Sequence, residues 1–233
     1  MCDTERMGKR QETRDRIERD IIEVGRRHLV TDGAAGLSLR AIARDLGMVS
    51  SAVYRYVASR DELLTLLIVD AYTDLADTVD RAAAGATDDW RDRLLEIARA
   101  ARRWAVEQPA SWALMYGSPV PGYHAPAELT VGPGTRVVAA LFAVVAAGVE
   151  AGEVPDGGPT PSRSTAADFD GLRTEFAFDG GDATVLKCFL LWSTMLGAIS
   201  LEVFGQYGAD TLSDPADVFD GQIQLLITAL AAN

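Results

Sequence analysis

Hydrophobic residues recur at helical spacing along most of this chain. Over residues 14–31 the apolar side chains stand three or four positions apart, which predicts an amphipathic helix that ends at Asp32-Gly33. The same spacing predicts further helices at residues 39–46, 50–56, 60–82, 88–107, 110–116, 135–151, 166–176, 183–207 and 214–231. Because no segment keeps the alternation of a strand, we expect an all-α protein of about nine or ten helices.

Local signals mark the ends of these helices. Ser38 stands where a serine can cap the helix of residues 39–46, and Gly47 after it supplies a left-handed residue. Ser59 and Glu62 form a capping box, in which each side chain accepts a hydrogen bond from the other residue's backbone, at the start of the long helix that follows. Clusters of Gly, Pro, Ser and Thr predict two loops, at residues 117–134 and 152–165.

A helix, a tight glycine turn and a second helix are the parts of a helix-turn-helix, whose second helix enters the major groove of DNA. Ala43 is small where the helices cross, and burial of Val53 and Val57 turns the other side of the second helix outward. The outward side chains offer hydroxyls, a methyl group and a guanidinium to bases and phosphates. The expected DNA-binding residues are Arg40, Ser50, Ser51, Ala52, Tyr54, Arg55 and Tyr56. The alternative is an exposed short helix in an ordinary bundle, with the Tyr54 ring partly in the core.

The segment LSLRAIARDLGMVSSAVYRYVASRDELL resembles the DNA-binding segment of the TetR family of bacterial one-component regulators. The resemblance covers about residues 14–82, and its motifs are LG at residues 46–47, VYRYV at residues 53–57 and SRDELL at residues 59–64. It implies a homodimer whose two reading helices lie about 34 to 36 Å apart on a near-palindromic operator. Each subunit would pair a helix-turn-helix domain, residues 1–64, with a larger helical domain for effector binding and dimerisation, residues 65–233.

Three positions differ from the family pattern. Val49 stands where the family often has a capping Ser or Thr, so Ser50 becomes the candidate cap of the reading helix. Tyr56 stands where His is frequent, and Arg60 stands where Lys is frequent. The resemblance adds Arg60 to the expected DNA-binding residues.

Acidic residues are concentrated outside this segment. The formal net charge is −12, but Met1 to Leu64 hold 12 Lys and Arg against 11 Asp and Glu, whereas the remaining 169 residues hold 10 against 23. A DNA backbone responds to local positive charge more than to the total charge of a chain. An acidic body would therefore repel DNA everywhere except at the helix-turn-helix.

Aromatic and methionine side chains in the C-terminal part predict a pocket for a small apolar effector, since apolar pockets between helices bind such compounds. The expected ligand-binding residues are Trp112, Met115, Tyr116, Phe142, Trp192 and Met195. Their alternative role is ordinary core packing.

The last two predicted helices favour self-association. LKCFLLWSTMLGAISLEVF is apolar around most of its circumference, and VFDGQIQLLITAL has an apolar face. Together they predict half of a four-helix bundle between two subunits, with burial inside one subunit as the alternative.

Several classes of protein are disfavoured. Neither Cys2 nor Cys188 has the neighbours of a thiolate metal site, and neither GxSxG, HExxH nor a Walker loop occurs, so we expect no metal, no cofactor and no enzyme activity. The charged N-terminus lacks the features of a secretory signal, and the apolar run of residues 137–149 is too short to span a bilayer.

The sequence predicts a cytoplasmic, ligand-responsive transcriptional regulator that represses by occupying its operator. The competing hypotheses are a small-molecule-binding protein that has lost operator recognition and an all-helical enzyme.

Overall fold

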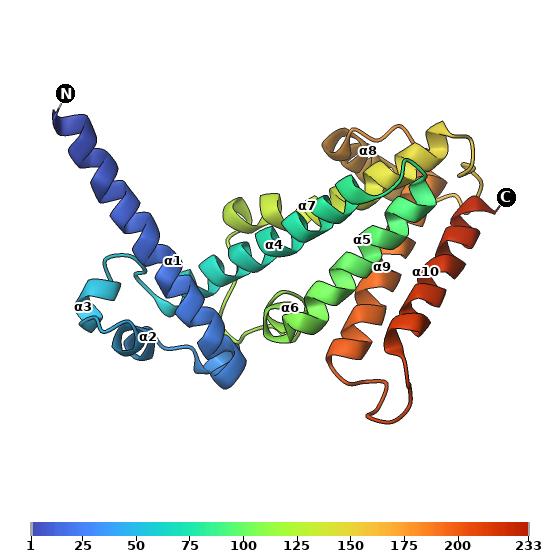
Figure 1. The fold of residues 1–233 in the computed structure, drawn as a ribbon. Coiled ribbons are helices and arrows are strands. Elements are labelled where there is room, and N and C mark those ends of the chain that lie inside the picture. The colour runs from blue at the N-terminus through green and yellow to red at the C-terminus, as the bar shows by residue number, and fades with distance from the viewer. Residues whose placement is uncertain (1, 233) are drawn as a thin grey trace. The chain divides into compact units, whose positions relative to one another are not determined.

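The structure is a computed structural model that describes residues 2–232, with side chains described from residue 11 onward. Over this range it contains ten α-helices and no strand, which confirms the all-α prediction (Figure 1). The helices are α1 (Cys2–Gly36), α2 (Leu39–Asp45), α3 (Ser50–Val53), α4 (Arg60–Gly85), α5 (Trp90–Glu107), α6 (Pro109–Tyr116), α7 (Ala127–Glu150), α8 (Arg163–Phe176), α9 (Asp182–Val203) and α10 (Pro215–Ala231).

The helix breaks near the N-terminus follow the local signals in the sequence. Gly33 has φ 67° and ψ 173°, so the regular helix of α1 is interrupted where Asp32-Gly33 predicted its end. Gly47, with φ 64°, occupies the left-handed region in the turn after α2. The third helix is shorter than expected, because α3 ends at Val53 and a turn continues to Tyr56.

The predicted loop of residues 117–134 is wrong in its second half, because α7 already begins at Ala127. The backbone N–H groups of Leu129 and Thr130 both donate to the Pro126 carbonyl at 3.1 Å, which starts the helix. The negative charge of Glu128 in the first turn is stabilised by the positive end of the helix dipole. Pro133 lies inside this helix, where it lacks the N–H that would donate to the carbonyl four residues earlier.

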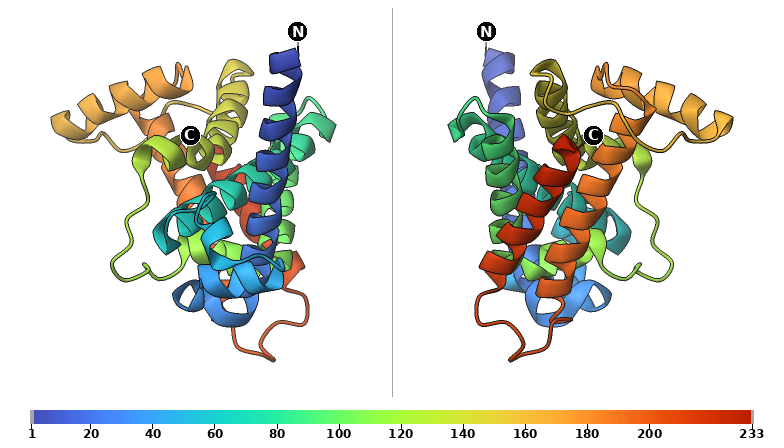
Figure 2. Two further views of the ribbon diagram at one scale, coloured as in Figure 1. Left: turned by 90° about the vertical axis from the view of Figure 1, so that its left-hand side faces the viewer. Right: turned by 90° about the vertical axis from the view of Figure 1, so that its right-hand side faces the viewer.

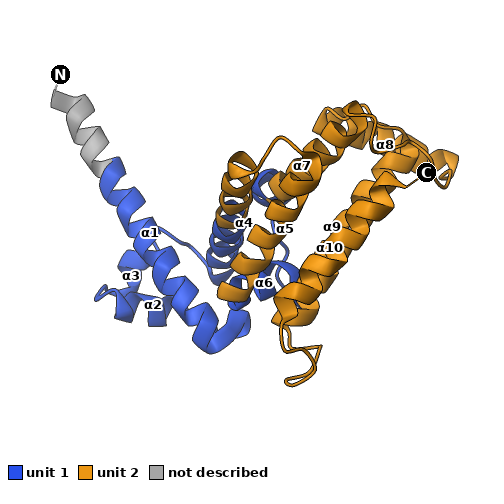
Figure 3. Cartoon of the chain, turned by 45° about the vertical axis from the view of Figure 1, so that its right-hand side comes forward, with its two compact units in different colours: residues 1–73, 108–133 blue, residues 74–107, 134–233 orange. Residues whose placement is uncertain are grey.

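The chain divides into two compact units, each built from two segments of the sequence (Figure 3). Unit 1 comprises residues 1–73 and 108–133, and unit 2 comprises residues 74–107 and 134–233. In unit 1, α6 packs against α1, so this unit contains more than the helix-turn-helix. The expected division into residues 1–64 and 65–233 remains a prediction about which segments act as domains.

The core of unit 1 gathers the apolar faces of α1, α2, α3 and α4. Ile21, Ile42, Val53 and Leu63 are each completely buried in it. Arg26 on α1 donates to Asp70 on α4 at 2.5 Å, which joins two helices that are 44 residues apart in sequence. This core holds the two short helices in place, since neither is long enough to be stable alone.

In unit 2, α5 packs against both α9 and α10, and α9 and α10 run side by side (Figure 2). Two ion pairs reinforce this packing: Arg99 donates to Asp220 at 2.7 Å, and Arg102 donates to Glu202. The helices α7 and α9 are each long and apolar enough to cross a membrane by length and composition alone. Core helices of soluble proteins share that property, and about a third or more of each apolar window is buried within the structure.

Candidate nucleic-acid interface

The helices α2 and α3 form a helix-turn-helix on the surface of unit 1. Ala43 is 1 % exposed where they meet, and its carbonyl accepts a hydrogen bond of 2.8 Å from the Met48 backbone N–H. The positive φ of Gly47 turns the chain between the two helices. Val53 and Val57 are fully buried, so the opposite side of α3 and of the turn after it must face outward.

The expected DNA-binding residues differ in how much of each side chain is exposed. Ser51, Arg55 and Arg40 are exposed, and the Tyr54 side chain is also exposed, at 45 %. Ser50, Ala52 and Tyr56 are half-buried, and Tyr56 packs against the core of unit 1. The surface available for reading bases therefore centres on Ser51, Tyr54 and Arg55.

A concave surface with two guanidinium groups adjoins this face. A pocket of about 350 Å³ is lined by Leu37, Ser38, Leu39, Arg40, Tyr54 and Arg60. Arg60 is anchored there, because its Nη2 donates to the Ala34 carbonyl at 2.7 Å. Two arginines and a phenol around one hollow match the chemistry of a phosphate group, which accepts hydrogen bonds from such donors.

Side-chain capping follows the predictions only in part. Glu62 donates its backbone N–H to Ser59 Oγ at 3.1 Å, but its carboxylate accepts from the Ala58 N–H instead of the Ser59 N–H. Ser38 is the N-cap residue of α2, yet its hydroxyl makes no capping bond. The prediction that Ser50 caps α3 is wrong, because Val49 occupies that position and Ser50 is the first helical residue. This helix has no side-chain cap, and burial of Val53 and Val57 fixes its position.

A polar contact that sequence reasoning missed fixes α2 against α1. His28 Nε2 lies 2.7 Å from Asp45 Oδ2, with only 12 % of the His28 side chain exposed. The hydrogen bond from His28 lowers the pKa of the Asp45 carboxyl group. Two residues 17 positions apart carry no joint signal in the sequence, so only the fold reveals the pair.

The six expected effector-binding residues are divided between the two units. In unit 1, Trp112 is 1 % exposed and packs on Tyr116 with ring centroids 4.5 Å apart, while Met115 is half-buried. Burial raises the pKa of the Tyr116 hydroxyl far above its ordinary value. In unit 2, Phe142 packs against Phe176 and Phe178, Met195 is 1 % exposed and Trp192 is half-buried. Their role in effector binding stays a prediction.

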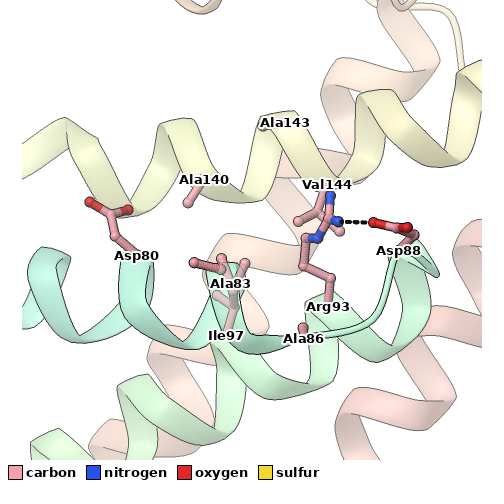
Figure 4. A pocket seen from close by; sticks show the side chains of 10 residues that line it. Asp80, Ala83, Ala86, Asp88, Arg93, Ile97, Ala140, Ala143 and Val144 are labelled. Carbon is pink, nitrogen blue, oxygen red and sulfur yellow. Dashed lines mark ion pairs between the residues drawn. The ribbon is translucent and has the colours of Figure 1, made fainter.

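A pocket of about 460 Å³ in unit 2 is lined by none of these six residues (Figure 4). It lies among the C-terminal end of α4, the N-terminal end of α5 and the middle of α7. Five of its ten lining residues are alanines, and the charged residues are Asp80, Asp88 and Arg93. Alanines in helices carry no chemical signal, which is why the sequence did not indicate this site.

A helix-turn-helix with an exposed second helix, joined to a second helical unit that holds a pocket, defines a DNA-binding regulator of the one-component class. Comparison with known proteins agrees: residues 21–67 match the bacterial regulatory proteins of the tetR family, and residues 94–226 match the tetracyclin repressor-like C-terminal domain. The chain belongs to the TetR family, which confirms the expectation of a DNA-binding transcriptional regulator.

Individual relatives extend over nearly the whole chain. The chain is 62 % identical over 235 residues to the HTH-type transcriptional regulators Rv1816 of Mycobacterium tuberculosis and Mb1846 of Mycobacterium bovis, covering 99 % of each sequence. The solved structure of the regulatory protein SCO4313 matches with a TM-score of 0.75 at 31 % identity, covering 94 % of this chain and 98 % of that one. Bacillus subtilis FadR, solved with stearoyl-CoA, matches with a TM-score of 0.66 at 10 % identity, over 90 % of this chain and 97 % of FadR, and so shares the fold alone.

Proposed function

We propose that this protein is a repressor that binds a near-palindromic operator as a homodimer and leaves it when a small molecule binds in unit 2. The observation that carries the proposal is the exposure of Ser51, Tyr54 and Arg55 on one side of a short helix whose other side is buried. These three side chains read bases, while Arg40 and Arg60 hold phosphates. Ser50, Ala52 and Tyr56 are half-buried, and they contact DNA through the atoms that remain exposed at the surface.

The exposed face of α9 supports the homodimer. Phe189, Leu190 and Leu201 are 45 %, 50 % and 43 % exposed, and Gly197 lies between them with no atom near the position of an added Cβ. On α10, Leu225 is 72 % exposed. Exposed apolar side chains of this size on two paired helices match the interface of a four-helix bundle between two subunits.

Repression needs no activity beyond occupancy, because a dimer seated on an operator blocks access to the promoter. Release needs an effector, and the pocket in unit 2 has a volume within the range of about 300 to 1,000 Å³ that is usual for small-molecule sites. FadR, whose structure holds stearoyl-CoA, has the same fold, so a fold of this kind accommodates a bound effector. The six aromatic and methionine residues expected from the sequence remain further candidates for contacts with it.

Selection of bound sequences from random duplex DNA tests the proposal. We expect one enriched near-palindrome. Arg40→Ala should weaken binding to all duplexes alike and reduce the slope of log K against log salt by about 1, because one phosphate contact is lost. Ser51→Ala and Tyr54→Phe should change the preferred sequence, since they alter base contacts.

Arg103→Ala is the matched control, because Arg103 is an exposed arginine on α5, outside the helix-turn-helix. It should leave affinity, salt dependence and sequence preference unchanged. Absence of any enriched sequence would favour a small-molecule-binding protein without operator recognition. Unchanged operator binding in all three test variants would contradict the proposed reading surface.

A further inference from the structure

One arginine on α5 has hydrogen-bonding capacity that the protein leaves unused. The Nε atom of Arg93 is buried and has no hydrogen-bond partner within the part of the chain that the structure describes. Its nearest contacts are weak: Nη2 lies 3.5 Å from Asp88 and 3.4 Å from the Thr87 carbonyl. The Asp88 side chain is fully exposed, so water competes for this ion pair.

Three other arginines on the same helix have close carboxylate partners. Arg99 donates to Asp220 at 2.7 Å, and Arg102 donates to Glu202 at 2.7 Å. Arg91 pairs with Glu153. Arg93 differs from these three in that its carboxylate partner, Asp88, lies 3.5 Å away and is fully exposed, although the Arg93 side chain is only 30 % exposed. A half-buried guanidinium in this state favours any carboxylate that can reach it.

Arg93 lines the pocket of about 460 Å³, and Figure 4 shows its side chain rising from α5 toward α7, beside Val144. The rest of the wall is mainly aliphatic, with Ala83 and Ala86 on one side, Ala140 and Ala143 on α7, and Ile97 on α5. The small alanine side chains leave room for an apolar body next to the charged group.

The acidic residues of the pocket do not reverse its preference for anions. Asp80 has a positively charged partner of its own, because Arg136 donates to both Asp80 and Asp77, at 2.5 and 2.7 Å. These carboxylates raise the pKa of Arg136 in turn. Among the described residues Asp88 pairs with Arg93 alone, at 3.5 Å, and its side chain is fully exposed, so a ligand carboxylate can replace it.

We propose that the effector is an organic carboxylate with a compact apolar body, whose carboxylate binds the Nη groups of Arg93 while its body fills the alanine-lined pocket. A guanidinium presents two parallel N–H groups to a carboxylate, which fixes the orientation of the ligand. This inference rests on the proposed function, since it names the chemical class of the effector that releases the operator.

Isothermal titration calorimetry of the full chain without DNA tests the site. The probes are hexanoate, octanoate and decanoate, with octan-1-ol and octylammonium as uncharged and oppositely charged counterparts. We expect saturable binding of at least one carboxylate and weaker binding of both counterparts. Arg93→Gln should weaken carboxylate binding by about 10- to 100-fold, which is the usual effect of losing a charged hydrogen bond. Its binding of octan-1-ol should not change.

A second variant separates binding from folding. Asp88→Asn should strengthen carboxylate binding a few-fold, because it removes the competitor and leaves Arg93 in place. A purely structural role of Arg93 predicts no such gain. The control Arg103→Gln removes a positive charge from the same helix at an exposed position and should leave binding unchanged. Octanoate should also release a selected operator from the wild-type protein and fail to release it from Arg93→Gln.

The outcomes separate this inference from the proposed function. No saturable carboxylate binding, equal binding of octanoate and octan-1-ol, or equal octanoate affinity in Arg93→Gln and wild type would overturn the anion site. Operator selection would still succeed in that case, because it does not depend on the pocket. Failure of operator selection with Arg93-dependent binding of octanoate would overturn the repressor and leave the anion site standing.

Discussion

At the scale of single residues, hydrogen bonds from charged and aromatic side chains join segments that lie far apart in the sequence. Lys187 on α9 donates to the carbonyls of Pro155 and Leu230, which ties a loop and the end of α10 to one side chain. Glu153 accepts from Trp90 Nε1 at 2.7 Å and pairs with Arg91, so the segment after α7 is held to the start of α5. These bonds lower the pKa of Glu153, with the Trp90 bond as the larger cause.

Glu153→Gln should therefore change the pH dependence of stability. A carboxyl group whose pKa is lowered by folding stabilises the folded state above its ordinary pKa and loses that contribution as the pH falls through the lowered value. We expect the variant to unfold at a slightly lower temperature than wild type at pH 7, and this difference to shrink as the pH falls below the ordinary glutamate pKa of about 4.3. Thermal unfolding followed by circular dichroism measures it. Glu150→Gln, at an exposed position of α7, is the control, and a difference that does not decrease as the pH is lowered would contradict the assignment.

At the scale of elements, the turn between α2 and α3 depends on one backbone conformation. Gly47 has φ 64°, and a Cβ added there would meet no atom within 4 Å. Substitution would therefore cost only the strain of the left-handed conformation, without any clash.

We expect Gly47→Ala to destabilise the protein by about 1 kcal/mol and to weaken operator binding, because relief of the strain changes the angle of α3. Gly85→Ala is the matched control: Gly85 also has open space around its Cβ position, but it ends α4 without a left-handed φ. Chemical denaturation and operator titration of both variants measure the effect. Equal stability of Gly47→Ala and wild type would show that the turn can relax without cost.

At the scale of the whole molecule, the proposed dimer depends on apolar surface that unit 2 leaves exposed on α9 and α10. Leu201→Glu and Leu225→Glu would place charges into a buried interface, which is strongly unfavourable without a partner. In the single chain both side chains are exposed, at 43 % and 72 %, so the fold itself should tolerate the change.

Sedimentation velocity at micromolar concentration should show a dimer for wild type and a monomer for the double variant. Operator affinity should fall at the same time, because two reading helices no longer bind together. Leu129→Glu, on an exposed leucine at the start of α7, is the control and should remain dimeric. A dimer that survives both substitutions would place the interface elsewhere.

Local signals in the sequence were sufficient for most of the fold and for the position of the helix-turn-helix. Gly47 marked the turn between α2 and α3, and Ser59 and Glu62 marked the start of α4. The beginning of α7 was missed, because Pro133 and its flanking glycines outweighed the helix-favouring residues before them in the sequence reading. The pairing of His28 with Asp45 was missed because it links two helices through side chains alone.

The sequence by itself determined the helices, the glycine turn and the family, because each of these depends on residues within one or two helical turns of one another. Tertiary structure decided which side chains within each unit meet. It left Arg93 with only a long ion pair to Asp88 while pairing Asp80 with Arg136, and it set Arg93 near alanines of α4, of the segment after α4 and of α7. The physical reason is that burial and pairing depend on contacts between different helices, 17 residues apart for His28 and Asp45 and 56 for Asp80 and Arg136, and helical periodicity carries no information on that scale.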